Sequence, residues 1–112
     1  MPAVYAEKLE RIRNDASLSR QDVAGIVGAS ARTVIRWATG QTLPRGTSRD
    51  RLLELAAVAQ QLAKVMRQDA ATAWLYEPNP LLDHERPVDF IGNGEYRKVL
   101  GAIDAIAEGV FV

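Results

Sequence analysis

Guanidinium and hydroxyl side chains are grouped at helical spacing between residues 30 and 36. Arginine pairs bidentately with guanine in the major groove of DNA, and serine or threonine binds phosphates or base edges. The candidate DNA contacts on this stretch are Ser30, Arg32, Thr33 and Arg36. Two flanking arginines, Arg20 and Arg45, are expected to hold the DNA backbone. We therefore expect operator DNA as a partner, against the alternative of a basic helix face that only meets solvent.

The residues around this stretch follow the spacing of a helix-turn-helix. The pattern reads Val23-Ala24-x-x-Val27-Gly28-Ala29-Ser30-x-x-Thr33-Val34-x-x-Trp37. A small residue at Ala24 lets two helices meet at a steep angle, and Gly28 permits a left-handed turn between them. Val34 and Trp37 would then close the wedge from the second helix. Because helix-turn-helix proteins usually read paired half-sites, we also expect a homodimer.

Charge is divided unevenly along a chain that is neutral as a whole. Residues 1–51 hold nine Lys or Arg against five Asp or Glu, whereas residues 52–112 hold five against nine. The halves therefore carry net charges of +4 and −4. This asymmetry favours two surfaces with different partners, of which the first is polyanionic.

The residue types offer little to an enzyme or a metal site. The chain has no cysteine and one histidine, which excludes disulfides, thiolate ligands and multi-histidine sites. Asp83, His84 and Glu85 are adjacent, so they point in different directions, and no nucleophile lies beside them. The stretch 91–94 contains two glycines but is too short for a dinucleotide loop and follows no strand. We expect no catalytic residue, no cofactor and no metal, and we expect His84 to be exposed or to cap a helix.

Targeting signals are also missing from the sequence. No apolar run approaches the ~18 residues that a membrane helix needs. The amino terminus lacks the basic-then-apolar order of a secretory leader, and a cysteine-free chain suits a reducing compartment. The expected location is the cytoplasm, with no membrane partner.

The elements that must position these residues are helices, since helix-forming residues dominate and strict apolar–polar alternation is absent. We predict an all-α fold in which an N-terminal helix-turn-helix bundle continues through a long central helix into a small helical module. The expected helices cover roughly residues 3–14, 20–27, 31–39, 49–66, 70–76, 87–91 and 95–108. The expected N-caps are Ser19, Ser30 and Asp69, and the expected C-terminal glycines are Gly28, Gly40 and Gly109.

The long central helix carries apolar residues on more than one face. One face runs from Leu52 through Leu55, Ala59 and Leu62 to Met66. A second apolar face is expected from Leu53, Val58 and Val65. The helix is therefore predicted to be a strut covered from two sides.

The second half contains a more specific set of motifs. They read Ala73-Trp74-Leu75-x-x-Pro78-Asn79-x-x-Leu82, Arg86-Pro87-x-x-Phe90-x-x-x-Gly94, Tyr96-x-x-Val99 and Ile103-x-x-Ile106-x-x-Gly109-Val110-Phe111. In this order, and after a helix-turn-helix, they make the chain resemble the Xre/MbcA/ParS family of antitoxins. The resemblance covers almost the whole chain.

The resemblance implies a type II antitoxin with two domains. Residues 1–66 would form a helix-turn-helix domain that binds the promoter of its own operon. Residues 67–112 would bind a cognate RES-domain toxin, an enzyme that degrades NAD, in a hetero-oligomer that occludes the toxin's active site. The family's tail, which reaches into the toxin pocket, corresponds here to Gly109, Val110, Phe111 and Val112.

Three alternatives stay open at this point. The apolar tail could fold back on its own core instead of entering a toxin. The chain could be a stand-alone helix-turn-helix regulator whose second half dimerises or senses a ligand. It could also be an interaction adaptor that has lost DNA binding.

Overall fold

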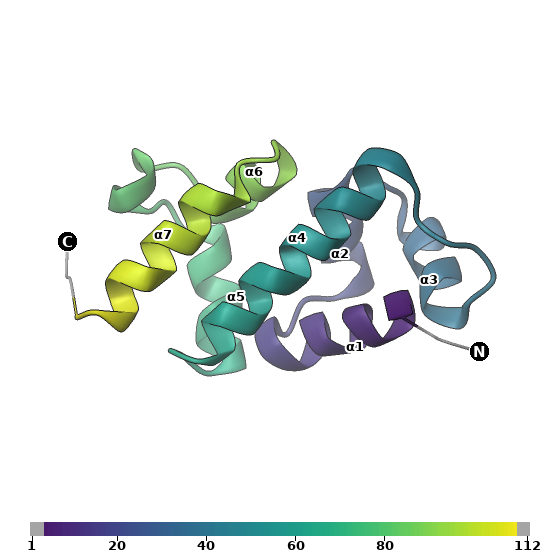
Figure 1. Cartoon of the computed structure of the whole chain (residues 1–112), viewed down its shortest axis with the longest axis horizontal. Helices are drawn as coiled ribbons and strands as arrows, with labels where there is room; N and C mark the ends of the chain where they lie inside the picture. The colour runs from purple at the N-terminus through teal and green to yellow at the C-terminus, as the bar shows by residue number, and fades with distance from the viewer. Residues whose placement is uncertain (1–3, 110–112) are drawn as a thin grey trace.

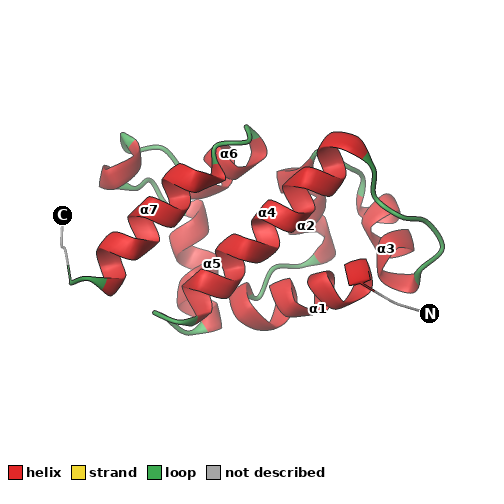
Figure 2. Cartoon of the chain, viewed as in Figure 1, coloured by secondary structure: helices red, strands yellow, loops and turns green. Residues whose placement is uncertain are grey.

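The computed structural model describes residues 4–109, and most of these residues are helical (Figure 2). The elements in chain order are α1 (Val4–Ala16), α2 (Arg20–Val27), α3 (Ala31–Thr39), α4 (Gly46–Ala63), α5 (Gln68–Tyr76), the short 3₁₀ helix η1 (Pro80–Leu82), α6 (Pro87–Gly92) and α7 (Tyr96–Ala107). An isolated bridge between Asn79 and Glu85 is the one β-type pairing in this part of the chain. The predicted all-α fold is confirmed. Among the helices described, none has both the length and the apolar character needed to cross a bilayer.

Helix α4 lies at the centre of the molecule and packs against α1, α2, α5, α6 and α7 (Figure 1). Its side chains Leu52, Leu55, Val58 and Leu62 are fully buried. The predicted strut is therefore confirmed, but Leu53 is 38% exposed and does not belong to a second buried face. Successive helical residues are about 100° apart, so Leu53 lies outside the arc that Leu52 and Leu55 turn toward the core.

Two helix starts differ from the sequence prediction. Helix α4 begins at Gly46 rather than near residue 49, because the carbonyl of Arg45 already accepts the N–H of Arg49 at 3.4 Å. The N–H groups in the first turn of a helix have no hydrogen-bond partner within the helix. A helix start of this kind therefore requires no particular residue types that could be recognised in the sequence. Helix α5 begins at Gln68 rather than after Asp69: its N-cap is Arg67, and the carboxylate of Asp69 accepts the N–H of Ala70 at 2.9 Å.

The caps around α2 and α3 agree with the prediction. Ser19 forms a capping box in which its hydroxyl accepts the N–H of Asp22, while the Asp22 carboxylate accepts the N–H of Ser19. Ser30 caps α3, and its hydroxyl accepts the N–H of Thr33 at 3.0 Å. Gly28 and Gly40 end the two helices in the left-handed conformation, with φ of 78° and 79°.

The helices of both halves share one cluster of buried side chains. Helix α5 packs on α1, where the hydroxyl of Thr72 donates to the carbonyl of Ala16, and α6 packs on α2. The predicted domain boundary after residue 66 falls in the turn between α4 and α5. The division into domains 1–66 and 67–112 stays a prediction.

Candidate functional site

Helix α3 presents a polar outer face because its inner face is anchored in the core. Val34 and Trp37 are 0% and 4% exposed, so residues between them must point outward. Arg32 and Arg36 are exposed, as is Ile35 at 48%. In Figure 1, α3 lies at one end of the long axis of the molecule, opposite the end of α7.

The helix-turn-helix wedge is formed by small residues, as its spacing predicted. Ala24 is 4% exposed, and its carbonyl accepts the N–H groups of both Gly28 and Ala29 at 3.0 Å. This pair of bonds turns the chain sharply from α2 into α3. Trp37 is a core residue, as expected, and not a stacking platform.

The two hydroxyls predicted to contact DNA are partly engaged within the chain. Ser30 Oγ donates to Thr33 Oγ1 at 2.8 Å while it caps α3. Ser30 is exposed and Thr33 is half-buried. Their oxygens can still accept or donate outward, but their first role is to hold the start of α3.

Four arginines of the first half are predicted to contact DNA. Among residues 4–109, no carboxylate lies within ion-pair distance of Arg20, Arg32, Arg36 or Arg45, whereas the nearby Arg49 lies 3.8 Å from Asp50. Arg32, Arg36 and Arg45 are exposed, and Arg20 is half-buried at the start of α2. The structure thus places uncompensated positive charge on α2, α3 and the α3–α4 loop, which is the charge that a polyanion attracts.

The opposite end of the molecule carries the second predicted site. Gly109 follows α7 with φ of 79°, and its N–H donates to the carbonyl of Ile106 at 3.0 Å, so α7 ends where predicted. Val110, Phe111 and Val112 lie outside the described residues. Their predicted contact with a toxin stays a prediction.

The acidic residues of the second half are partly neutralised. Asp89 accepts two hydrogen bonds from Arg86, from Nε at 3.0 Å and from Nη2 at 2.9 Å. The hydrogen bonds and charge of Arg86 lower the pKa of Asp89. Glu95 pairs with Lys98 at 3.1 Å, whereas Asp83 and Glu85 are exposed. Two of these four carboxylates are thus paired with basic side chains.

The motif residues Trp74 and Asn79 have structural roles. Trp74 is half-buried and packs against the core. Asn79 is 8% exposed; its side-chain oxygen accepts the N–H of Leu81, and its carbonyl accepts the N–H groups of Leu82 and His84. Asn79 thus organises the loop that ends at Glu85. His84 is exposed in that loop, as expected, with φ of 63°.

A contact that the sequence did not reveal joins the two halves. The hydroxyl of Tyr76, at the end of α5, donates to Asp22 Oδ1 at 3.1 Å. Burial, and then the charge and hydrogen bond of Asp22, raise the pKa of Tyr76 to about 12. The guanidinium of Arg86 lies 5.8 Å above the Tyr76 ring. No motif spacing marks this pair, because 54 positions separate its members.

A second link runs from α4 to the turn between α6 and α7. Arg51 Nε donates to the carbonyl of Gly92 at 3.3 Å, and Nη1 pairs with Glu54 at 3.0 Å. A Cβ at Gly92 would lie 3.3 Å from the carbonyl oxygen of Ile26. The glycine therefore allows the backbone of this turn to approach α2 closely.

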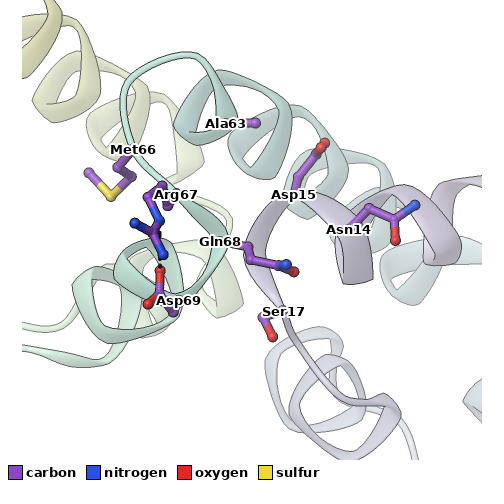
Figure 3. A pocket seen from close by; sticks show the side chains of 8 residues that line it. All are labelled: Asn14, Asp15, Ser17, Ala63, Met66, Arg67, Gln68 and Asp69. Carbon is purple, nitrogen blue, oxygen red and sulfur yellow. Dashed lines mark ion pairs between the residues drawn. The ribbon is translucent and has the colours of Figure 1, made fainter.

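Figure 3 shows a hollow that is lined mostly by polar side chains. It measures about 650 Å³ and lies between the ends of α1 and α4 and the start of α5. Its one drawn ion pair joins Arg67 to Asp69 at 3.9 Å, and both side chains are largely exposed. Within residues 4–109 no three His, Asp or Glu side chains are grouped closely enough to hold a metal.

Comparison with known proteins shows similarity along nearly the whole chain. No family model matches the sequence. The chain is 50% identical over 95 residues to the mycobacterial cidal antitoxin MbcA of Mycobacterium tuberculosis and of Mycobacterium bovis, covering 85% of this chain and 84% of each relative. It is 30% identical over 110 residues to a probable mycobacterial cidal antitoxin of M. tuberculosis, covering 98% of this chain and 94% of that relative. A chain in the crystal structure of the M. tuberculosis MbcT–MbcA toxin–antitoxin complex superposes with a TM-score of 0.88 at 45% identity, covering 97% of this chain and 98% of that chain.

Proposed function

Because this chain belongs to the family of the mycobacterial cidal antitoxin MbcA, we propose that it is a type II antitoxin that binds and inhibits a cognate toxin. The observation that carries the proposal is that the similarity extends through the helix-turn-helix and the second half alike. A chain related only through its helix-turn-helix would support a DNA-binding role and nothing more. The antitoxin acts by binding, not by catalysis.

The toxin in this proposal is a RES-domain enzyme that degrades NAD. Its active site is occluded by the tail Gly109, Val110, Phe111 and Val112. The left-handed turn at Gly109 supports this assignment, because it ends α7 at the end of the molecule remote from α3 (Figure 1). Burial of an aromatic side chain such as Phe111 contributes about 2–3 kcal/mol to such a complex.

The DNA-binding part of the proposal rests on Ser30, Arg32, Thr33, Arg36, Arg20 and Arg45. The antitoxin binds the promoter of its own operon through these residues, as a homodimer that reads paired half-sites. The uncompensated arginines and the capped, core-anchored α3 support this role. The partners are thus the toxin, in a hetero-oligomer, and operator DNA.

Co-expression with the product of the adjacent gene tests the proposed function. A tagged form of this chain should co-purify with that product and should restore the growth that the product alone suppresses. If the adjacent product neither binds nor suppresses growth, the chain is instead a stand-alone regulator, and promoter binding becomes its main function. A variant that lacks residues 110–112 serves as the matched control within the same assay.

A further inference from the structure

We propose that Tyr76 is a positioning residue for DNA binding, through which the second half of the chain holds the start of α2. This inference rests on the proposed DNA-binding role of the helix-turn-helix. Tyr76 lies outside that motif and would not contact DNA itself. It acts through Asp22.

The two carboxylate oxygens of Asp22 accept hydrogen bonds from different parts of the chain. Its Oδ2 accepts from the backbone N–H of Ser19 at 3.0 Å and from Ser19 Oγ at 2.9 Å. Its Oδ1 accepts from the hydroxyl of Tyr76 at 3.1 Å. The carboxylate that closes the capping box is therefore the same one that is held by the second half. Hydrogen bonds to an ionised acceptor are stronger than neutral ones, so this anchor restrains the start of α2.

Tyr76 also has a charged neighbour in the second half. Arg86 lies 5.8 Å above its ring, and the two hydrogen bonds from Arg86 to Asp89 hold that guanidinium on α6. A hollow of about 190 Å³ adjoins the ring between α2 and α6. Packing alone thus leaves the ring room to shift, and the hydroxyl fixes its place.

The position of α2 determines how α3 meets DNA. The two helices pack together across the wedge at Ala24, and the first helix of such a motif crosses the DNA backbone while the second enters the major groove. Backbone contacts set the register in which base contacts are made. If the start of α2 is less restrained, phosphate binding near Arg20 should weaken. Arg32 and Arg36 on α3 should then be misplaced relative to the bases.

The test measures DNA affinity in Tyr76→Phe, which removes one hydroxyl and keeps the ring. The probe is the duplex immediately upstream of the chain's own coding sequence, with a scrambled duplex for comparison. Tyr96→Phe is the matched control, since Tyr96 lies on α7 with its ring 5.7 Å from Arg97. Circular dichroism at 25 °C verifies that each variant is folded. A variant that is less stable but still folded at this temperature should bind DNA with unchanged affinity.

We expect Tyr76→Phe to weaken upstream-duplex binding about three- to tenfold, which is the fold-change expected for the loss of one typical intramolecular hydrogen bond. The slope of log affinity against log salt should become shallower by about one for each phosphate that the variant no longer binds. In an Asp22→Ala background the same change should have no further effect, because the two residues act as one unit.

Three results would overturn the inference: an affinity of Tyr76→Phe within twofold of the wild type, an equal loss in Tyr96→Phe, or additive losses in the double variant. If the wild type prefers neither duplex, the proposed DNA-binding role fails first, and the inference fails with it. The two failures are thus distinguished by the wild type alone.

Discussion

A Cβ atom on Gly94 would lie 2.6 Å from Nη2 of Arg51. The guanidinium is held there by the carbonyl of Gly92 and by the carboxylate of Glu54. Gly94 also has φ of 83°, which side chains rarely tolerate. The turn between α6 and α7 is therefore shaped to receive an arginine from the central helix.

Gly94→Ala should destabilise the protein because it strains the backbone and displaces Arg51. We expect a loss of about 1–2 kcal/mol in the free energy of unfolding, measured by urea titration. Gly101→Ala is the matched control, since Gly101 lies within α7 and its added Cβ would have no heavy atom within 4 Å apart from its chain neighbours and the backbone of its own helix. That control should stabilise the protein by about 0.5–1 kcal/mol, and equal effects of the two changes would contradict this explanation.

Ionisation of Tyr76 should occur at an unusually high pH in the wild type. Tyr76 has a pKa raised to about 12, so the folded state keeps its proton while the unfolded state loses it near the ordinary value of 10. Its contribution to stability is therefore complete below pH 10 and is lost as the pH rises from about 10 to about 12. Absorbance titration of tyrosinate should show a late step that disappears in Tyr76→Phe and persists in Tyr96→Phe. A late step that survives in Tyr76→Phe would assign it to another tyrosine.

Arg32→Ala combined with Arg36→Ala should weaken binding to the upstream duplex by at least about tenfold, because each bidentate base contact contributes about 1–3 kcal/mol. Both side chains are exposed, so the fold and toxin inhibition should persist. Arg67→Ala combined with Arg97→Ala removes the same charge from exposed positions in the second half. A fluorescence-anisotropy titration over several salt concentrations compares the two. Equal losses would mean that net charge, not the face of α3, determines DNA affinity.

Deletion of Val110–Val112 should abolish toxin inhibition and leave DNA binding intact. Growth rescue in cells that co-express the toxin measures the effect. The thermal unfolding midpoint of the shortened chain is measured in parallel, which separates a loss of inhibition from a loss of stability. Full rescue by the shortened chain would show that inhibition depends on another surface of the second half.

Local rules predicted the features that lie within a few residues of one another. The caps at Ser19 and Ser30, the left-handed ends at Gly28 and Gly40 and the inward Val34 and Trp37 follow from short-range patterns, and the structure confirms them. The helix-turn-helix could thus be placed from its sequence to within a residue or two.

Features that depend on distant residues could not be predicted in this way. The Tyr76–Asp22 hydrogen bond and the approach of Gly92 to Ile26 arise only when α5 and α6 fold onto α2. The exposure of Leu53 could not be predicted either. Helical spacing alone does not show which parts of a helix surface a neighbouring helix covers. The starts of α4 and α5 were misplaced because neither has a side-chain cap of its own.

The shared core has a consequence for how related antitoxins can exchange parts. Consider a chimera of two related antitoxins that is joined in the turn between α4 and α5. Its α5 would pack on an α1, and its α6 on an α2, that come from the other parent protein. Such a recombinant would need matching partners for Thr72, Tyr76 and Gly92 in its new first half. We therefore expect the two proposed specificities, for toxin and for operator, to be inherited together unless these contacts are transferred with them.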